Sequence, residues 1–435
     1  MKAHSSSNYR VQYLKLASYS DVKRKILSAI ERAQTEIEMV RVDRAHGRIS
    51  AETVRSKVDL PARPISAMDG YAIRSEETRQ ASSSNPVRFS VKGSIFPDSS
   101  RVPRISSKDA FYVATGSSLP IGATAVVRVE HVRLEGKQVA VTRRIQRMAN
   151  VSERGDDIRR GQTIVAKERM LTPSDIALLI SSGVTHVKVL NLLRVGILSI
   201  GNELRRFHGK RPKAGVTYNN YMNLVSGYLL EHGAVPVPVG ICPDDSKKIR
   251  SVIASKIENL DALITIGGSS VGAKDYTMDA LSSLPQSTTV FHGVRLVPIR
   301  PAGLVMFRTK PVIVVPGHAV SAALTFFLIV APVLNALLGL PLEFGKASLM
   351  AKATEEFGNS RPIDALYLVK LGKSSGEYLG TPLGWGSNLL ENLSSASGYA
   401  YLKAGQKISK GESFNVFLLG SRQISAIPTL GDETL

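Results

Sequence analysis

Acidic residues lie close to glycine-bearing turns in the middle of the chain. Glu203, the pair Asp244 and Asp245, and Asp275 each follow soon after a predicted buried strand. Carboxylates that face a phosphate group repel it unless a cation lies between them, and Mg²⁺ bound by carboxylates and phosphates is the usual arrangement. The pattern therefore suggests metal-assisted phosphate chemistry. In an alternative reading Asp244 or Asp245 only caps the following helix, whereas Asp275 is less easily explained as a cap.

Three glycine-bearing turns accompany these carboxylates, and each follows a predicted strand. Ligands of open α/β sheets bind at the carboxyl ends of the strands. Glycine lets the backbone approach a ligand closely, and amides at the next helix N-terminus can receive phosphate oxygens. One such turn is well explained by tight packing alone, but three on one sheet favour a ligand site. The turns lie at residues 199–203, 267–272 and 315–318.

The elements that must position these residues alternate between strand and helix from Leu193 onward, which is typical of βαβ units and a parallel sheet. The apolar run 319–340 is about long enough to cross a bilayer. Because it follows a strand and a Pro-Gly turn directly, we expect a buried core helix instead. His318, at the start of this helix, is expected to be a hydrogen-bonding cap and not a metal ligand. The expected strands are 195–200, 235–239, 262–266 and 312–315, and the expected helices are 220–233 and one after Asp245.

Outside this region the patterns differ. Apolar residues from Val22 to Ile37 recur at helical spacing, with Ser20 or Asp21 as the expected cap. A second helix is expected after Thr172, with Pro173 at its first position. Trp385, the single tryptophan, is expected to pack in the last domain. Short β-type runs are expected at 87–91, 110–114, 125–129 and 139–142, and again after residue 341.

These elements predict a multidomain α/β protein. A central α/β domain with a mostly parallel sheet is joined by a β-rich domain, a linking helical and mixed domain, and a C-terminal β domain. The predicted boundaries are 12–60 with 152–190 for the linking domain, 61–151 for the β-rich domain, 191–340 for the α/β domain and 341–435 for the C-terminal domain.

Composition places limits on the function. The 435 residues carry a formal net charge of +20, which attracts anionic partners without identifying them. Nucleic acid is an unlikely partner, because the chain shows no helix-turn-helix, zinc module or aromatic-basic interleaving. A single cysteine, Cys242, excludes a disulfide within the chain. Since the N-terminal residues also lack the apolar stretch of a secretion signal, we expect a cytoplasmic protein without a membrane anchor.

Several segments resemble the molybdopterin molybdenumtransferase family, in the order that this family shows. The most specific match is Ser66-Ala67-Met68-Asp69-Gly70-Tyr71-Ala72, which is similar to the family's N-terminal signature nearly residue for residue. The resemblance covers almost the whole chain. Further matching segments are 45–49, 59–61, 115–116, 119–123, 154–158, 267–276, 386–387 and 397–398.

The resemblance implies a homodimer whose pterin nucleotide lies between the α/β domain of one subunit and the β-rich domain of the other. The implied reaction inserts molybdate into adenylylated molybdopterin, with release of AMP and with Mg²⁺. It also implies docking of an adenylylating partner protein. The implied catalytic residues are Asp69, Thr115, Asp157, Glu203, Asp245 and Asp275. Of these, Glu203, Asp245 and Asp275 are the implied metal ligands. The implied substrate-binding residues are Gly201, Gly267, Gly268, Ser270, Gly272, Arg300, Pro301, Pro316, Gly317 and Ser321.

The chain departs from the family pattern at several of these positions. The family's Lys-Pro-Gly-Lys-Pro loop corresponds to Val297-Pro298-Ile299-Arg300-Pro301, so Val297 replaces a lysine implicated in holding oxyanions. Arg300 keeps a cation, although a guanidinium does not reproduce a compact ammonium charge. The alternative prediction is therefore a diverged paralogue that prefers tungstate, or that binds the pterin nucleotide or a partner protein without turnover. Further departures are Thr124, Asn202, Asn219 and His318.

Overall fold

The computed structural model describes residues 16–31, 33, 36–210, 217–269, 275–341, 348–386 and 388–419. They form two compact units. The smaller unit is Ile37–Leu190, and the larger unit combines the described parts of Met1–Glu36 and Asn191–Leu435. The predicted division into four domains stays a prediction.

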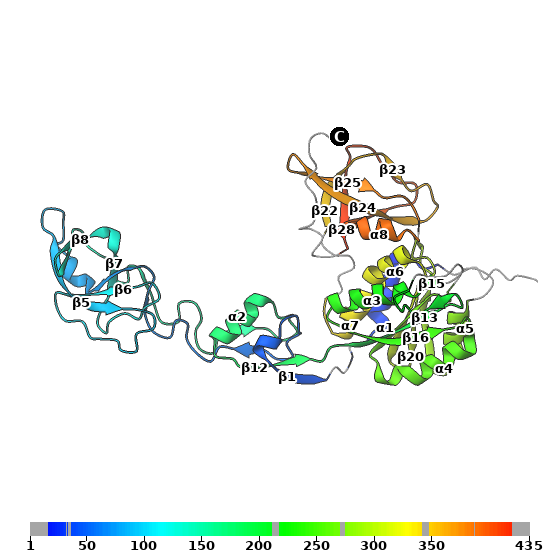
Figure 1. Cartoon of the computed structure of the whole chain (residues 1–435), viewed down its shortest axis with the longest axis horizontal. Helices are drawn as coiled ribbons and strands as arrows, with labels where there is room; N and C mark the ends of the chain where they lie inside the picture. Colours follow the sequence, from blue (N-terminus) through cyan, green and yellow to red (C-terminus); the bar gives the residue numbers. More distant parts are fainter. Residues whose placement is uncertain are drawn as a thin grey trace, which may run out of the picture. The chain divides into compact units, whose positions relative to one another are not determined.

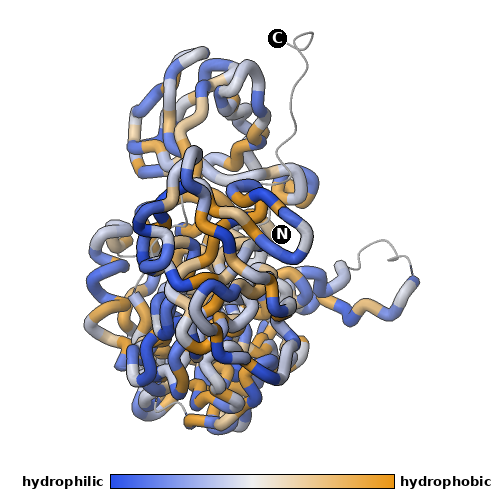
Figure 2. The backbone as a smooth tube through the Cα atoms, turned by 90° about the vertical axis from the view of Figure 1, so that its left-hand side faces the viewer, coloured by the Kyte–Doolittle hydropathy of each residue, from blue (hydrophilic) through white to orange (hydrophobic). Residues whose placement is uncertain are grey.

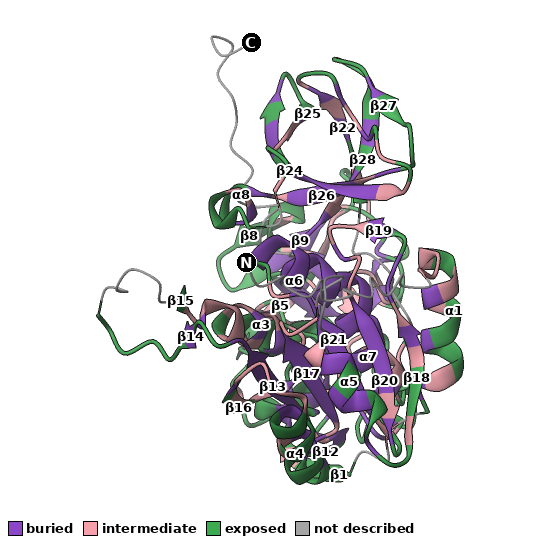
Figure 3. Ribbon diagram, turned by 90° about the vertical axis from the view of Figure 1, so that its right-hand side faces the viewer, coloured by how far each residue is buried: buried purple, intermediate pink, exposed green. Residues whose placement is uncertain are grey.

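A six-stranded sheet forms the centre of the larger unit (Figure 1). Its strand order is β16-β13-β17-β21-β20-β18, in which the first four strands are mutually parallel and β20 runs antiparallel to both of its neighbours, β21 and β18. All five residues of β17 are buried, as expected for a strand covered on both faces (Figure 3). The mostly parallel sheet was predicted. The strands are β13 (Arg194–Ile200), β16 (Val235–Cys242), β17 (Ala262–Ile266), β18 (Ser287–His292), β20 (Gly303–Phe307) and β21 (Lys310–Val315).

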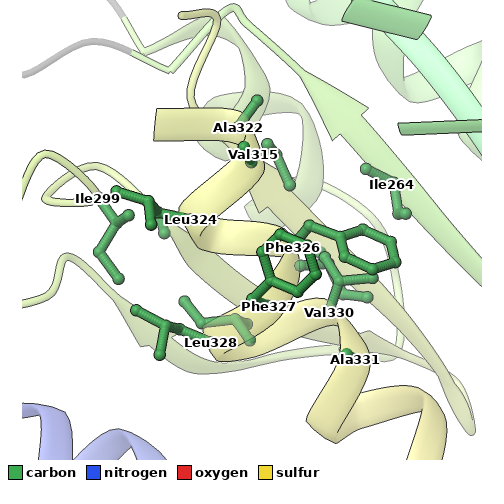
Figure 4. Packing of buried hydrophobic residues seen from close by; sticks show 14 of the residues in the cluster. Ile264, Ile299, Val315, Ala322, Leu324, Phe326, Phe327, Leu328, Val330 and Ala331 are labelled. Carbon is green, nitrogen blue, oxygen red and sulfur yellow. The ribbon is translucent and has the colours of Figure 1, made fainter. Parts of the chain in front are cut away.

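Helices pack against this sheet. The long apolar helix consists of α6 (Ala319–Thr325), a π-helical turn at Phe326–Val330 and α7 (Ala331–Leu337). Figure 4 shows Phe326, Phe327 and neighbouring apolar side chains of this helix gathered in the core. By length and composition this helix would suffice to span a membrane. Of its most apolar stretch of 18 residues, however, 89% is buried inside the protein, so the predicted core helix is confirmed. The other helices beside the sheet are α3 (Asn220–Glu231), α4 (Ser246–Lys256) and α5 (Tyr276–Ser282), whereas α8 (Leu390–Ser395) contacts α6 and the strand β24 (Asp364–Ser374).

The first helix is shorter than predicted. Helix α1 (Tyr19–Ala29) is capped by Ser18, whose hydroxyl oxygen accepts from the backbone amide of Asp21 at 3.1 Å. The prediction of Ser20 or Asp21 as the cap was wrong, as was the extension to Ile37, which is exposed at the start of a strand. Val22 and Ile26 join the core of the larger unit. Residues 19–29 therefore pack with the α/β sheet, although they fall within the predicted linking segment 12–60.

The C-terminal strands of the larger unit close into a barrel. The order is β24-β25-β22-β28-β26, and β26 pairs again with β24. Figure 2 shows hydrophilic and hydrophobic residues interspersed along the chain. In β24, Ala365 and Tyr367 face the barrel core, whereas Leu366 and Leu368 join the core around α6 and α7. The barrel strands are β22 (Ser348–Ala353), β24 (Asp364–Ser374), β25 (Glu377–Pro382), β26 (Gly398–Leu402) and β28 (Ser413–Leu418).

Two shorter pairings complete the larger unit. Strand β19 (Leu296–Val297) runs parallel to the start of β24, so the segment between β18 and β20 of the α/β sheet is tied to the barrel. The other short strands are β14 (Leu204–Arg205), β15 (Thr217–Tyr218), β23 (Phe357–Gly358) and β27 (Lys407–Ile408).

The smaller unit contains a second six-stranded sheet with the order β7-β4-β6-β5-β9-β8. The four β runs predicted between residues 87 and 142 are all found in it. Helix α2 (Pro173–Ser181) begins at the predicted cap, where Thr172 and Asp175 form a capping box. The sheet strands are β4 (Gly70–Ile73), β5 (Val87–Ile95), β6 (Asp109–Val113), β7 (Ala125–Arg128), β8 (Val132–Glu135) and β9 (Gln138–Val141).

The smaller unit also contains short antiparallel pairs of strands. They are β1 (Ile37–Arg41) with β12 (His186–Leu190), β2 (Val54–Arg55) with β11 (Thr163–Val165), and β3 (Ile65–Ser66) with β10 (Val151–Ser152).

Candidate functional site

A cavity of about 710 Å³ opens at the carboxyl ends of β13, β17 and β21. This is the edge of an open α/β sheet at which ligands bind. The three predicted glycine-bearing turns all contribute to its wall. The predicted site residues that line it are Gly201, Glu203, Gly267, Gly268, Pro301, Pro316 and Gly317.

Close backbone packing explains the glycines. Gly267 has a φ of +88°, and a Cβ atom there would lie 2.6 Å from the carbonyl oxygen of Ile200. A Cβ atom on Gly317 would lie 3.1 Å from the Cα atom of Gly267. The turns after β13, β17 and β21 therefore contact each other through their backbones. Side chains larger than hydrogen would push these turns apart and change the floor of the cavity.

Two carboxylates belong to the cavity wall, Glu203 and Asp244. The Asp244 carboxylate accepts a hydrogen bond from the backbone amide of Asn202 at 3.1 Å, and the Asn202 side-chain oxygen accepts from the amide of Asp244 at 3.3 Å. Burial, and in addition the negative charge of Glu203, raises the pKa of Tyr221, which lines the same cavity. Its phenol therefore stays protonated and can donate a hydrogen bond.

The side chains of Asp245 and Asp275 cap helices and do not face the cavity. The Asp245 side chain caps α4 by accepting from the amides of Lys247 and Lys248 at 2.9 and 3.2 Å. The Asp275 side chain caps α5 by accepting from the amide of Met278 at 2.9 Å. Neither residue is among those lining the cavity. The expectation that Asp275 is hard to explain as a cap was wrong, because α5 begins directly after it and its first amides need acceptors.

The predicted metal set is therefore not gathered in one place. Within the described ranges no cluster of three or more His, Cys, Asp or Glu side chains is arranged to hold a metal ion. Glu203 and Asp244 are the carboxylates that the fold directs to the cavity, and the roles of Asp245 and Asp275 stay predictions. The Nε2 atom of His292 lies 3.1 Å from the Oδ2 atom of Asp275. Ser270 and Gly272 lie outside the described residues.

The loop 297–301 borders a second cavity of about 300 Å³. Pro301, Pro316 and His318 line both cavities, so the two adjoin. Val297, where the family resemblance predicts a lysine, pairs with Ala365 in the β19–β24 ladder and lines the second cavity. Ser321 also lines the second cavity, whereas the half-buried Arg300 is not among the residues lining either one.

His318 does not cap the helix that it precedes. It occupies the N-cap position of α6, but its side chain makes no capping hydrogen bond. The predicted capping role was wrong. The exposed imidazole instead lines both cavities, where it can contact a bound molecule.

Among the residues of the second cavity that sequence reasoning missed are Arg361 and Tyr367. It expected Trp385 to pack in the last domain. The Trp385 ring does contact Tyr367 of the barrel, with centroids 4.9 Å apart, yet Trp385 is 41% exposed and lines the cavity. No local pattern marks these side chains, because the barrel lies far along the chain from the glycine-bearing turns.

In the smaller unit the structure brings Asp69 and Thr115 together. The Asp69 carboxylate accepts from the backbone amide of Thr115 at 2.7 Å and from its hydroxyl at 2.8 Å. These two hydrogen bonds hold the pKa of Asp69 below its usual range, the amide having the larger effect. Asp157 is also exposed, and its backbone amide donates to the carbonyl of Leu60 at 3.0 Å.

The substitution Thr115→Val should raise the pKa of Asp69 while leaving it below the usual aspartate value. Valine removes the hydroxyl donor and keeps both the side-chain shape and the backbone amide. A depressed pKa keeps the carboxylate ionised to lower pH, so any stability that ionisation contributes is lost only as pH falls through the folded-state pKa. Titration of the carboxyl carbon by NMR measures the change. An unchanged pKa in the variant would show that the hydroxyl bond is absent in solution.

Comparison with known proteins is consistent with these features. The family model described as "MoeA N-terminal region (domain I and II)" matches residues 17–183, and the one described as "Probable molybdopterin binding domain" matches residues 196–336. A molybdopterin molybdenumtransferase from Haemophilus influenzae is 30% identical over 70% of this chain and 74% of its own. One from Bacillus subtilis is 28% identical over 91% of this chain and 93% of its own.

Solved structures of MoeA proteins are similar to this chain over most of its length. A crystal structure of the molybdopterin biosynthesis MoeA protein from Pyrococcus horikoshii is 26% identical and superposes with a TM-score of 0.76. The superposition covers 94% of this chain and 100% of that one. A second crystal structure from the same organism, 24% identical with a TM-score of 0.78, shares the fold.

Proposed function

Because the chain belongs to the molybdopterin molybdenumtransferase family, we propose that it inserts molybdate into adenylylated molybdopterin and releases AMP. The observation that carries this proposal is the cavity at the strand ends, where three glycine-bearing turns meet two carboxylates. Such an edge suits a ligand with phosphate groups, because backbone atoms can approach the phosphates closely. We place the reaction in the cytoplasm.

Glu203 and Asp244 fit the donor set of a magnesium ion that is shared with substrate. Mg²⁺ in phosphate sites is usually held by one or two carboxylates together with phosphate oxygens and water. When bound, it would neutralise the diphosphate and assist cleavage of the link to AMP. The protonated phenol of Tyr221 supplies a hydrogen-bond donor on the same wall. The backbones of Gly267 and Gly268 leave room for the nucleotide to lie against the sheet edge.

The smaller unit contributes to the site through dimerisation in this proposal. Asp69, Thr115 and Asp157 of the partner subunit would line the substrate opposite Glu203. The ordered Asp69–Thr115 pair supports this role, because an exposed carboxylate held by two donors is ready to orient a polar group. The adenylylated substrate would be delivered by a separate adenylylating protein.

The direct test is to incubate the purified protein with adenylylated molybdopterin, molybdate and Mg²⁺. We expect release of AMP together with a cofactor that activates a molybdenum-free apoenzyme. Omission of molybdate is the matched control, since it separates hydrolysis of the nucleotide from insertion of the metal. If neither product forms although the nucleotide binds, the catalytic proposal fails.

A second candidate function is binding of the pterin nucleotide without turnover, or turnover with tungstate. It is favoured by Val297, which places an aliphatic side chain on the wall of the second cavity where the family resemblance predicts a lysine. Equilibrium binding of the nucleotide without AMP release would support the binding protein. A faster reaction with tungstate than with molybdate would support the tungsten enzyme. Restored turnover in a Val297→Lys variant would identify the missing cation as the cause.

The neighbouring Asp244 and Asp245 provide a matched pair of substitutions. We expect Asp244→Asn to lower the rate of AMP release by roughly 10- to 100-fold, because it removes a carboxylate from the cavity wall. Asp245→Asn should keep both the rate and the stability, because asparagine caps a helix about as well as aspartate. Steady-state kinetics and urea unfolding of both variants measure these effects. A lower rate of AMP release in Asp245→Asn than in Asp244→Asn would instead assign the metal-binding role to Asp245.

A further inference from the structure

Arg205 holds the short turn that carries the cavity carboxylate Glu203. One guanidinium nitrogen, Nη1, donates to the backbone carbonyl oxygens of Asn202 and Leu204, at 2.8 Å in each case. These are the carbonyls on either side of Glu203. The carbonyl of Glu203 itself accepts from the amide of Thr217 at 3.2 Å. Each of these three backbone carbonyls therefore has a donor, and two of them share the same charged group.

Two further contacts fix the carboxylates of the cavity wall. A Cβ atom on Gly201 would lie 2.7 and 2.8 Å from the two carboxylate oxygens of Glu203, so this carboxylate is folded back over the backbone of Gly201. Asn202 exchanges two hydrogen bonds with Asp244, at 3.1 and 3.3 Å. The turn therefore sets where both carboxylates lie, and a change in its backbone would move them.

Arg205 acts on this turn from outside the cavity. It is exposed and is not among the residues lining the cavity. It belongs to β14, which runs parallel to β15, and its own carbonyl accepts from the amide of Asn219 at 2.9 Å. The guanidinium thus contacts the backbone of the turn and not the space that a substrate would occupy. A side chain in this place acts through the residues that it holds.

We propose that Arg205 is a positioning residue, which holds the backbone on either side of Glu203 so that its carboxylate and that of Asp244 can share one divalent cation. The proposal rests on the proposed function and adds to it. A metal ligand on a turn that takes several conformations must be ordered when the metal binds, and this ordering lowers the affinity. Residues that orient metal ligands typically contribute roughly 10- to 100-fold to metal affinity or activity.

Metal affinity can be measured without the nucleotide. Mn²⁺ is the probe in place of Mg²⁺, because both prefer oxygen ligands and the EPR signal of free Mn²⁺ reports how much is bound. We expect the full-length protein to bind Mn²⁺ at a site that Glu203→Gln abolishes. Arg205→Met should weaken this site by roughly 10-fold. Arg205→Lys should lose less, because an ammonium still donates to carbonyl oxygens. Absence of an Mn²⁺ site that depends on Glu203 would overturn the proposal.

The sign of the change separates positioning from simple electrostatics. Removing a positive charge near a cation site should by itself strengthen binding of the cation, whereas loss of positioning weakens it. A tighter Mn²⁺ site in Arg205→Met would therefore contradict the positioning role.

Arg206→Met is the matched control. Arg206 is also an exposed arginine, next in the sequence, and it makes neither of the two hydrogen bonds to the turn. Its Mn²⁺ affinity should not fall. Equal losses in the two methionine variants would assign the effect to the segment as a whole and sink the specific role of Arg205. Urea unfolding followed by Trp385 fluorescence checks that both variants are folded.

The outcomes separate this proposal from the proposed function. The Mn²⁺ measurements decide the role of Arg205 even if no AMP is released. Where AMP is released, Arg205→Met should lower kcat by roughly 10-fold and leave the KM for the nucleotide unchanged. Added to Glu203→Gln, it should lower the rate little further, because it acts through that carboxylate. A full further loss in the double variant would show that Arg205 acts independently of Glu203 and would overturn the proposal.

Discussion

Replacing Glu203 by glutamine is expected to lower the rate of AMP release by roughly 100-fold, the largest effect on activity that we predict. Glutamine preserves the shape of the side chain and removes the charge that a shared Mg²⁺ requires. Glu203 is exposed on the cavity wall, so stability should change by no more than about 0.5 kcal/mol. The measurement is the steady-state rate of AMP release across a magnesium titration. A variant with the rate and magnesium dependence of the unaltered protein would remove Glu203 from the reaction.

Two further proteins make this result specific. Glu231→Gln is the matched control, because Glu231 is exposed at the end of α3 and is not among the residues lining the cavity. Its rate should be unchanged. The second is a co-expressed mixture of Glu203→Gln and Asp69→Asn subunits. If sites are shared between subunits, each mixed dimer has one intact site and regains activity, whereas either variant alone is nearly inactive. Failure to regain activity would contradict the shared site.

Gly267→Ala is expected to destabilise the larger unit by roughly 2 to 4 kcal/mol, the largest effect on stability that we predict. Two causes add. Gly267 has a φ of +88°, which an alanine adopts only with strain, and the new methyl group would lie 2.6 Å from the Ile200 carbonyl oxygen. The backbone of β13 would have to move to relieve that contact. Because Trp385 lies in the same unit, urea unfolding followed by its fluorescence measures the change.

Gly376→Ala separates the two causes. Gly376 has a φ of +85°, nearly that of Gly267, but a Cβ atom there would meet no other atom within 4 Å. Gly376→Ala should therefore lower the free energy of unfolding by only about 1 to 2 kcal/mol, from backbone strain alone. Equal destabilisation by the two variants would show that the contact with Ile200 is relaxed in solution and that φ strain accounts for the whole effect.

Some structural features could be predicted because they depend on neighbours in the sequence. The cap Thr172 stands directly before Pro173 and three residues before Asp175, and all three act within one turn. The apolar run from Ala319 predicted a buried helix, and its hydrophobic residues indeed fill the core. The helix at the N-terminus was predicted too long, since apolar spacing continued to Ile37 after the backbone had left the helix at Ile30.

The candidate site was predicted only in part, and the misses have a common cause. Sequence order cannot tell which of Asp244 and Asp245 faces the cavity, because that depends on where the first free amides of α4 point. Both Asp275 and His318 precede a helix, yet only the side chain of Asp275 caps it. Such choices depend on the direction of the preceding strand and on what else competes for the side chain.

By itself the sequence determined the alternation of strands and helices, the edge of the sheet at which the glycine-bearing turns meet, and the family. Those properties follow from local periodicity and short motifs. Only the tertiary structure decided that Asp244 lines the cavity while Asp245 caps a helix, and that Arg361 and Trp385 of the barrel border the loop at Val297. The physical reason is that these contacts join segments far apart in the chain, and their geometry depends on how whole elements pack.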